Sequence, residues 1–386
     1  MNQLTKDKNI ICKRCVMDST DPDIYFDSHG ICSHCIEFEE KIKKNWLRGE
    51  KGKKELEKIV ENIKKETRGK SYNAILGLSG GMDSSYLAIL MKDYGLKILA
   101  LHVDAGWNSE IAVSNIEKIL DYTGYDLYTE VIDWEQMREL QLAYLKSGVE
   151  NLDVPQDHIF NSILYKTASR LGIKYILSGG NIATESILPK AWEWSALDSR
   201  NLKSIAKNYK VNLRKYETIG FFEHYIFHKK IIKIKSIRPL NYVDYNKNNA
   251  IKVLKKTCGW QSYKYKHGES IFTSFFQNYI QPTKYKIDKR KAHLSSLILS
   301  EQLSREEALS ELKNLPYDDY IEYEKQYMAN KLQISLDELE NILLQEPKSF
   351  RDYPNWEKRI KLITLVFVKI NLIRNFLAKQ IYKKNM

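Results

Sequence analysis

Apolar residues follow two different periods in the middle of the chain. Short apolar runs, which are typical of buried strands, alternate with longer segments whose apolar residues recur at helical spacing. Strands and helices in alternation predict a parallel sheet with helices on both faces. The expected strands are 72–78, 98–103, 127–132 and 174–177, and the expected helices are 83–94, 109–123, 134–147 and 156–171.

The pattern changes on both sides of this series. Residues 37–68 are charged and carry apolar residues at helical spacing, so one or two amphipathic helices are expected there. A further strand is expected at 231–237, and residues 244–382 are expected to be mostly helical. The predicted fold class is therefore α/β, a doubly wound parallel sheet with a mainly helical C-terminal region. The expected units are a cysteine knuckle at 1–40, a helical linker at 41–70, the sheet domain at 71–243 and the helical region at 244–386.

The composition limits the number of domains, the location and the partners that the chain can have. The 386 residues are 43% hydrophobic, which suffices for one large domain with appendages or for two moderate ones. Charged residues interrupt the apolar segment 360–377, and residues 1–10 are polar, so we expect a cytoplasmic protein without membrane insertion. Lys and Arg exceed Asp and Glu by 61 to 49, and the net charge of +12 suits a nucleic acid, a nucleotide sugar or an acidic protein without choosing among them.

A glycine-rich turn lies between the first expected strand and the first expected helix. Paired glycines let the backbone approach an anion closely, and a helix start presents unpaired N–H groups to it. The spacing fits neither a Walker loop nor the dinucleotide fingerprint. It matches the S-G-G-x-D-S turn of the PP-loop ATP pyrophosphatases, which split ATP into AMP and pyrophosphate, whereas a serine-rich helix cap would leave the double glycine unexplained. The turn spans residues 79–85, and its predicted ATP- and pyrophosphate-binding residues are Ser79, Gly80, Gly81, Asp83, Ser84 and Ser85.

Two further strand ends carry candidate nucleotide-binding residues. Ligands of open parallel sheets bind beyond the carboxyl ends of the strands. At the end of the second strand, the backbone of Val103 is expected to meet an adenine edge, and Asp104 to face ribose or a metal. At the end of the fourth strand, Gly179 and Gly180 permit close approach to nucleotide or substrate. An Asx turn at Asp104 and an ordinary loop at the glycines are the alternatives.

Four of the five cysteines lie in the first thirty-five residues. Cys12 and Cys15 form one C-x2-C knuckle, and Cys32 and Cys35 form a second, a spacing typical of a structural zinc site. Disulfides are the alternative, but they do not explain this clustering well in a chain without a secretory signal. Four thiolates close the tetrahedral shell, so the expected Zn²⁺ is structural.

The combined motifs resemble the bacterial N-acetyl sugar amidotransferases of the PP-loop superfamily. The resemblance covers residues 10 to about 320, and no motif is assigned beyond it. It implies that an acetamido group on a sugar becomes an acetamidino group during surface-glycan synthesis, such as that of lipopolysaccharide O-antigen, with ATP and ammonia. It also implies a separate glutaminase similar to the histidine-biosynthesis subunit, sometimes with a cyclase-like partner. The motifs are 12–23, 79–85, 266–273 and 287–296.

The resemblance also implies a chemistry for individual residues. An amide oxygen becomes a leaving group when it attacks the α-phosphorus of ATP, and the loop then holds the departing pyrophosphate. Magnesium is expected to bridge the phosphates and to touch Asp83. Lys266, Lys289 and Arg290 are candidates for neutralising the phosphates, with solvated surface lysines and arginine as the alternative. No role is assigned to three further residues of these motifs, His267, Glu269 and His293.

One cysteine, Cys258, bears on two questions: whether the chain makes its own ammonia, and whether it transfers nitrogen or sulfur. Cys258 follows a helical segment rather than a strand-to-helix elbow, so a structural thiol is expected and ammonia must come from outside the chain. The alternative function is a PP-loop enzyme that thiolates tRNA, which the positive charge would suit. Such an enzyme usually needs a free thiol near the nucleotide, and Cys258 alone is left for that role, so a nucleic-acid partner is not favoured. A non-catalytic nucleotide sensor is the third possibility.

Overall fold

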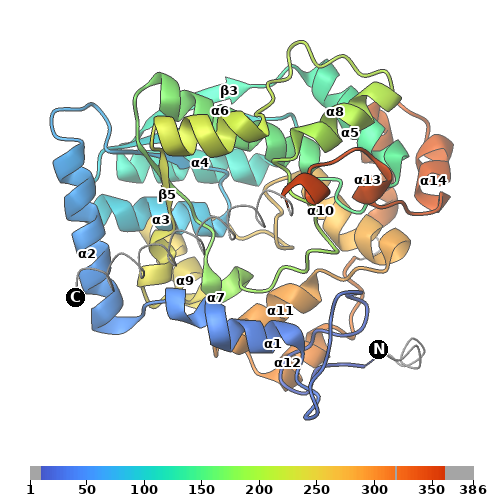
Figure 1. The fold of residues 1–386 in the computed structure, drawn as a ribbon, viewed down its shortest axis with the longest axis horizontal. Coiled ribbons are helices and arrows are strands. Elements are labelled where there is room, and N and C mark those ends of the chain that lie inside the picture. Colours follow the sequence, from blue (N-terminus) through green and yellow to red (C-terminus); the bar gives the residue numbers. More distant parts are fainter. Residues whose placement is uncertain (1–9, 318–319, 361–386) are drawn as a thin grey trace, which may run out of the picture.

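The computed structural model describes residues 10–317 and 320–360, and Figure 1 shows their arrangement. Five parallel strands form one sheet in the order β3-β2-β1-β4-β5. The predicted parallel sheet is confirmed, and each expected strand is present with boundaries shifted by a few residues. The strands are β1 Ala74–Gly77, β2 Ile98–Asp104, β3 Asp126–Val131, β4 Tyr175–Leu177 and β5 Lys235–Ile237.

Alternate residues of the central strands enter two different hydrophobic cores. In β1, Ile75 packs with Leu99 and Leu101 of β2 on one face of the sheet. The neighbouring Leu76 packs on the opposite face with Ala100. Because successive side chains of a strand point to opposite faces, the sheet is buried on both sides, as expected for a doubly wound fold.

Helices of the βα series cover both faces (Figure 1). Residues of α3 and α4 belong to one core, and those of α5 and α6 belong to the other. Their bounds agree with the prediction to within two residues. They are α3 Met82–Asp93, α4 Glu110–Thr123, α5 Trp134–Ser147 and α6 Val154–Arg170.

The segment before β5 differs from the prediction. A strand was expected over 231–237, but residues 223–231 form the π-helix η4 (Glu223–Ile231), and β5 keeps just the last three residues. Lys233 between them has a φ of 64°, a left-handed turn that separates helix from strand. Two helices that the sequence analysis did not predict lie between β4 and η4, namely α7 Ile182–Glu185 and α8 Ser199–Asn208.

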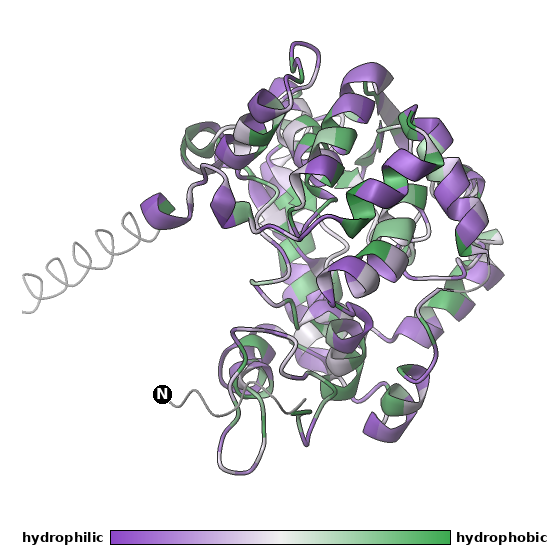
Figure 2. Ribbon diagram, turned by 90° about the vertical axis from the view of Figure 1, so that its right-hand side faces the viewer, coloured by the Kyte–Doolittle hydropathy of each residue, from purple (hydrophilic) through white to green (hydrophobic). Residues whose placement is uncertain are grey.

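Helices also build the two ends of the described chain. The N-terminal end contains α1 Ser33–Glu37, η2 Phe38–Ile42, η3 Lys43–Asn45 and α2 Gly49–Glu66. After β5 the described residues up to 360 are mostly helical, as predicted, while residues 361–382 of the predicted helical region lie outside the described residues. The helices of the molecule carry both hydrophilic and hydrophobic residues (Figure 2). These elements are η5 Pro239–Tyr242, α9 Lys247–Cys258, α10 Ile271–Phe275, η6 Phe276–Tyr285, α11 Arg290–Leu299, α12 Arg305–Glu311, α13 Ile321–Leu332, α14 Leu336–Leu344 and η7 Phe350–Asp352. Within residues 10–317 and 320–360, none of the helices is both long and apolar enough to cross a membrane.

The cysteine knuckle, residues 12–35, packs against α11 and α12, which lie more than 250 residues later in the sequence (Figure 1). Buried Asp18 pairs with Lys291 of α11, and the backbone N–H of Val16 donates to Ser295 Oγ at 3.1 Å. Arg305 of α12 donates to the carbonyl oxygens of Cys12 and Cys15 at 2.9–3.2 Å. The knuckle is therefore an integral part of the C-terminal region rather than a separate appendage.

Removing Lys291 tests the importance of this contact for stability. In Lys291→Ala, the carboxylate of Asp18 loses its paired cation, and solvent cannot replace it well because 4% of the Asp18 side chain is exposed. An unpaired buried charge costs about 3–5 kcal/mol, so we expect the free energy of unfolding in urea to fall by about that much. The control is Lys41→Ala, whose pair with Glu37 is 70% and 54% exposed and should contribute less than about 1 kcal/mol. Equal effects of the two changes would contradict the proposed stabilising role.

Candidate nucleotide-binding site

The glycine-rich turn joins β1 to α3 as predicted. Gly81 is the N-cap of α3 with extended backbone, and Gly80 has a φ of 79°. A Cβ atom at Gly80 would lie 2.5 Å from the carbonyl oxygen of Ala112 in α4. Both the left-handed conformation and the close approach to α4 therefore require glycine at this position.

Three side chains from distant parts of the chain donate to the carbonyl oxygen of Gly80. Trp260 Nε1 and the Tyr263 hydroxyl each lie 2.9 Å from it, and Asn115 Nδ2 lies 3.5 Å away. Asn115 also exchanges hydrogen bonds with the backbone of Gln261, at 2.7 and 2.9 Å. The turn is thus held from outside by α4 and by the segment that follows α9.

A cavity of about 420 Å³, called here the loop cavity, lies over the turn. The backbone and side chains of the turn form one wall, and the loop after β4 forms another. Six of the predicted nucleotide-site residues line it, namely Ser79, Gly81, Asp83, Ser84, Gly179 and Gly180. Gly80 and Ser85 do not line it, because the carbonyl of Gly80 faces Trp260 and the side chain of Ser85 is fully buried.

Asp83 is held by two side chains at the edge of this cavity. It accepts hydrogen bonds from the Tyr245 hydroxyl and from Asn181 Nδ2, the latter at 3.0 Å. Burial, and secondly the charge of Glu185, raise the pKa of Asp83 to about 6. A Cβ atom at Gly179 would lie 3.0 Å from the backbone of Asp83 and Ser84. The glycine after β4 therefore permits close packing against the start of α3.

The segment 266–269 adds charged side chains of both signs to the lining of the same cavity. Lys266 Nζ lies 3.3 Å from Glu185 and donates to His293 Nδ1 at 2.8 Å. Burial lowers the pKa of His293 far below its ordinary value, and the charge of Lys266 adds to this effect, so His293 is neutral and accepts that hydrogen bond. His267 Nδ1 lies 3.6 Å from Glu269. Burial opposes the charge of His267, but the Glu269 carboxylate outweighs it, and the net shift of the His267 pKa is upward.

A second cavity of about 300 Å³, the strand-end cavity, opens beyond β1 and β2. Apolar side chains of Leu78, Leu101 and Phe160 line it, together with Val103, as expected for a slot that holds a base. Ser79 and Glu269 line both this cavity and the loop cavity. Asp104 is not among the lining residues, because its carboxylate accepts from the backbone N–H of Gly106 at 2.8 Å and from Asn108 at 3.0 Å. This is the Asx-turn arrangement that the sequence analysis kept as its alternative.

A third cavity of about 490 Å³, the C-terminal cavity, adjoins the loop cavity through shared residues that include Lys247, Lys266 and His293. All three predicted phosphate-neutralising residues, Lys266, Lys289 and Arg290, line it. Lys289 pairs with Glu193, and Arg290 pairs with Asp288, its Nη2 lying 2.7 Å from Oδ2. Five side-chain amides also line it, those of Asn248, Gln277, Asn278, Gln302 and Asn314.

The sequence analysis missed several residues of these cavities. Lys247, at the start of α9, lines both the loop cavity and the C-terminal cavity, and burial lowers its pKa. Glu185 and Tyr245 contact the charged residues of the site. None of these belongs to a short motif, and they reach the site through the packing of α7 and α9.

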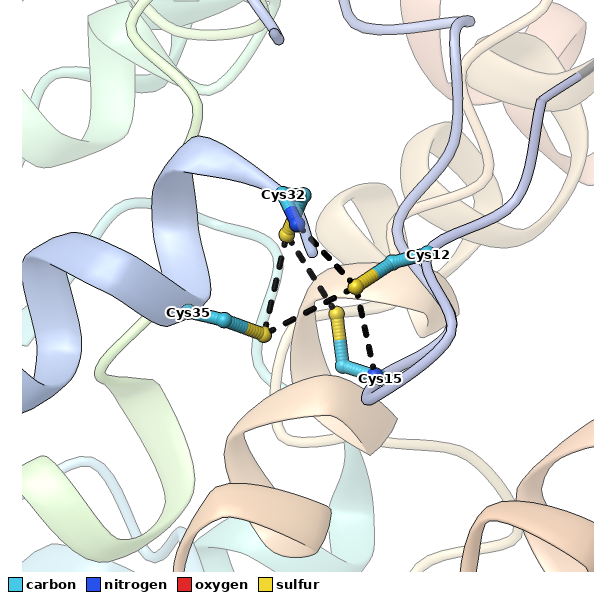
Figure 3. Close-up of side chains that lie close together, drawn as sticks. All are labelled: Cys12, Cys15, Cys32 and Cys35. Atoms are coloured by element: carbon cyan, nitrogen blue, oxygen red, sulfur yellow. Dashed lines mark hydrogen bonds between the residues drawn. The ribbon is translucent and has the colours of Figure 1, made fainter. Parts of the chain in front are cut away.

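The four N-terminal cysteines form a compact, fully buried cluster (Figure 3). Their Sγ atoms lie within 4.8 Å of one another, with pairs at 3.6–3.9 Å. A tetrahedron with Zn–S bonds of about 2.3 Å has edges of about 3.8 Å, so the cluster fits Zn²⁺. Cys12 Sγ also accepts hydrogen bonds from the backbone N–H groups of Arg14, Cys15 and Cys32, which favours a thiolate.

Two family models match the chain. Residues 73–191 match the model of the queuosine biosynthesis protein QueC. Residues 269–366 match the model of the LPS biosynthesis protein WbpG-like C-terminal domain. The chain belongs to the PP-loop ATP pyrophosphatases and carries a WbpG-like C-terminal domain. The resemblance drawn from the motifs is confirmed at the level of the family. The WbpG-like match extends beyond residue 320, where no motif was assigned.

Individual relatives of this PP-loop protein match shorter parts of it. A tRNA(Ile)-lysidine synthase from Chlamydia pneumoniae is 32% identical over 90 residues, which are 20% of this chain. The matched part spans 28% of the length of that relative. An NH3-dependent NAD synthetase from Campylobacter jejuni aligns with 42% of this chain and 75% of its own at 18% identity and a TM-score of 0.28. The NMN synthetase of Francisella tularensis aligns with 55% of this chain and 88% of its own at 15% identity and a TM-score of 0.28. The two family-model matches make the chain an ATP-using PP-loop enzyme.

Two glycine substitutions separate backbone strain from the clash with α4. Gly80 and Gly124 both have positive φ, but a Cβ atom at Gly124 has no neighbour within 4 Å. Gly124→Ala should therefore lose about 1–2 kcal/mol of unfolding free energy and keep ATP binding. Gly80→Ala must in addition displace the turn from Ala112, and we expect it to lose ATP binding as measured by calorimetry. Wild-type affinity in Gly80→Ala would show that the turn does not need this geometry.

Metal content tests the cysteine cluster. We expect about one Zn²⁺ per chain by elemental analysis, and a lower melting temperature after treatment with a chelator, since structural zinc stabilises the folded state. Cys15→Ser should lose the metal, whereas the control Cys258→Ser should keep it. Stoichiometric zinc in a Cys12→Ser/Cys32→Ser double variant would refute this site.

Proposed function

We propose that the chain is the synthetase half of an amidotransferase that converts an acetamido group on a sugar into an acetamidino group. The reaction would use ATP, release AMP and pyrophosphate, and take ammonia from a separate glutaminase, within the synthesis of lipopolysaccharide O-antigen or a related surface glycan. The WbpG-like match supports a sugar substrate, since that family is described by a role in LPS biosynthesis.

The observation that carries this proposal is the adjacency of two differently lined cavities. The loop cavity is built around the PP-loop turn, and the C-terminal cavity beside it is lined largely by the WbpG-like domain. Side-chain amides suit the hydroxyl and acetamido groups of a sugar, because each amide both donates and accepts. The lysines suit a phosphate or another anionic group of the substrate. An ATP site thus adjoins a separate polar site for an acceptor.

The residues of the loop cavity suit the activation step. The backbone N–H groups at the start of α3, together with Ser79 and Ser84, would hold the pyrophosphate as negative charge develops on it. Lys266 lies over the same space and would neutralise phosphate charge, with Lys247 beside it. Bound magnesium would supply further charge stabilisation, and Asp83, which lines the cavity, would help to hold it. The strand-end cavity would take the adenosine, with the backbone of Val103 at the base.

The tRNA-thiolation alternative lacks a thiol at this site. Cys258 lies at the end of α9, and its Sγ donates to the carbonyl oxygen of Leu254 at 3.3 Å. It lines none of the three cavities described above. The remaining cysteines form the metal cluster. The position of Cys258 therefore supports nitrogen transfer over sulfur transfer.

Nitrogen dependence tests the proposal directly. We expect the purified chain, given ATP, magnesium and a panel of free, UDP-linked and CMP-linked N-acetylated sugars, to form AMP and an amidine with ammonium salts but not with glutamine alone. A glutaminase subunit should restore glutamine use, and mass spectrometry should detect the loss of one mass unit when NH replaces O. Cys258→Ala should keep the ammonia-dependent rate, and a sulfur-modified tRNA product that this change abolishes would favour the rival function.

A further inference from the structure

Gln277 lines the C-terminal cavity, in the part of the chain that matches the WbpG-like domain. It is half-buried and belongs to the π-helix η6. The sequence motifs do not include it, and no step of the activation chemistry uses it. A side-chain amide both donates and accepts, so the orientation of this amide decides which group of a ligand it binds.

A buried carboxylate fixes the orientation of the Gln277 amide. Asp153, the N-cap of α6, is 6% exposed and accepts from Gln277 Nε2 at 3.1 Å and from the Thr273 hydroxyl at 2.9 Å. Burial raises the pKa of Asp153, whereas the charge of Lys289 and these two hydrogen bonds favour its ionised form. An ionised carboxylate only accepts, so it binds the NH₂ side of the amide and leaves Oε1 turned away from it.

The hydrogen bonds behind Asp153 agree with this orientation. The backbone N–H of Thr273 donates to Ser270 Oγ at 3.3 Å, and the Ser270 hydroxyl donates to Gln156 Oε1 at 3.0 Å. Gln156 Nε2 in turn donates to the Thr273 hydroxyl at 3.4 Å, which leaves the hydrogen of that hydroxyl for Asp153. Each donor of this network therefore meets an acceptor when Gln277 presents its NH₂ group to Asp153.

The Oε1 atom of Gln277 remains available to a ligand. Within the described part of the chain it has no hydrogen-bond partner, and it is not one of the buried unpaired polar atoms, so it is accessible. Donation to a charged carboxylate polarises the amide and makes its oxygen a stronger acceptor. The other amides of the cavity differ. Gln302 uses both ends in hydrogen bonds to the backbone, Asn278 donates within its own helix, and Asn248 and Asn314 are exposed.

We propose that Gln277 Oε1 accepts a hydrogen bond from the N–H of the acetamido group and thereby selects N-acetyl over O-acetyl sugars. This inference rests on the proposed amidotransferase reaction. An ester has no N–H, and its oxygen would leave Oε1 without a donor.

The same hydrogen bond would assist activation. As the amide oxygen bonds to the α-phosphorus, the P–O bond to pyrophosphate breaks and pyrophosphate leaves with the electron pair. The lone pair of the amide nitrogen moves into the C–N bond, so the N–H group gains positive charge and keeps its hydrogen. An acceptor placed on that N–H therefore binds it more strongly in the transition state than in the ground state.

A pair of ligands that differ in one group tests this role. The pair is the sugar that forms the most amidine in the panel of N-acetylated sugars, and its analogue with an O-acetyl group at the same position. By calorimetry without ATP, we expect the wild-type protein to bind the N-acetyl ligand about 10-fold or more tightly than the O-acetyl analogue. In Gln277→Met, which keeps the length of the side chain without the amide, the ratio of the two dissociation constants should fall to about one.

A second variant keeps a donor for Asp153. The lysine of Gln277→Lys donates but cannot accept, so the ratio should fall there too while the buried carboxylate keeps a partner. The added charge acts on both ligands alike and leaves their ratio unchanged. Gln326→Met makes the same replacement on the exposed side of α13 and is the matched control, which should keep the wild-type ratio. A merely structural role of Gln277 would weaken both ligands equally and would not move the ratio.

Three results would overturn the inference. A ratio near one in the wild-type protein would show that the site does not recognise the N–H group. A wild-type ratio in both Gln277 variants, with or without its loss in Asn278→Leu, would show that Gln277 does not select the acetamido group. Failure of every sugar of the panel to form an amidine with the wild-type protein would refute the proposed function itself, and it is distinguished from the other results because it appears without any substitution.

Discussion

The carbonyl oxygen of Gly80 fixes the geometry on which the candidate site depends. Trp260, Tyr263 and Asn115 donate to it from outside the turn. In a trans peptide the C=O and the following N–H point in opposite directions, so holding this carbonyl outward turns the N–H of Gly81 the other way. Each buried donor left without its acceptor would cost about 1–3 kcal/mol. The conformation of the turn is therefore fixed by contacts within the protein itself.

This arrangement also links the two halves of the chain. Trp260 and Tyr263 follow α9, more than 170 residues after the turn that they hold. The same segment continues into Lys266, His267 and Glu269, which line the loop cavity. The C-terminal region thus both holds the turn in its conformation and places charged side chains at the cavity above it. A PP-loop sheet without this region would lack both contributions.

The sequence predicted the parts of the structure that local patterns determine. The βα series and the glycine turn follow from periodicity and from steric requirements within a few residues, and both are confirmed. The cysteine spacing likewise predicted a cluster whose sulfur atoms fit zinc. The π-helix η4 was missed because its apolar residues also suit a strand. Asn115, Trp260 and Lys247 were missed because their roles arise from tertiary packing. Arg290 shows the reverse limit, since its position in a motif did not predict that Asp288 pairs with it locally. Asp104 adopts the Asx turn that the sequence analysis kept as its alternative.

Helix α11 connects the cysteine knuckle to the C-terminal cavity. Side chains four residues apart lie on the same face of a helix, whereas a shift of two residues turns the direction by about 200°. Lys289 and His293 accordingly line the C-terminal cavity, while Lys291 and Ser295 bind the knuckle on the other side. A shift of the knuckle would move the cavity wall with it, because a short helix transmits displacement as a rigid body. The cysteine cluster thus stabilises the position of the residues that line the C-terminal cavity, although it lies outside all three cavities.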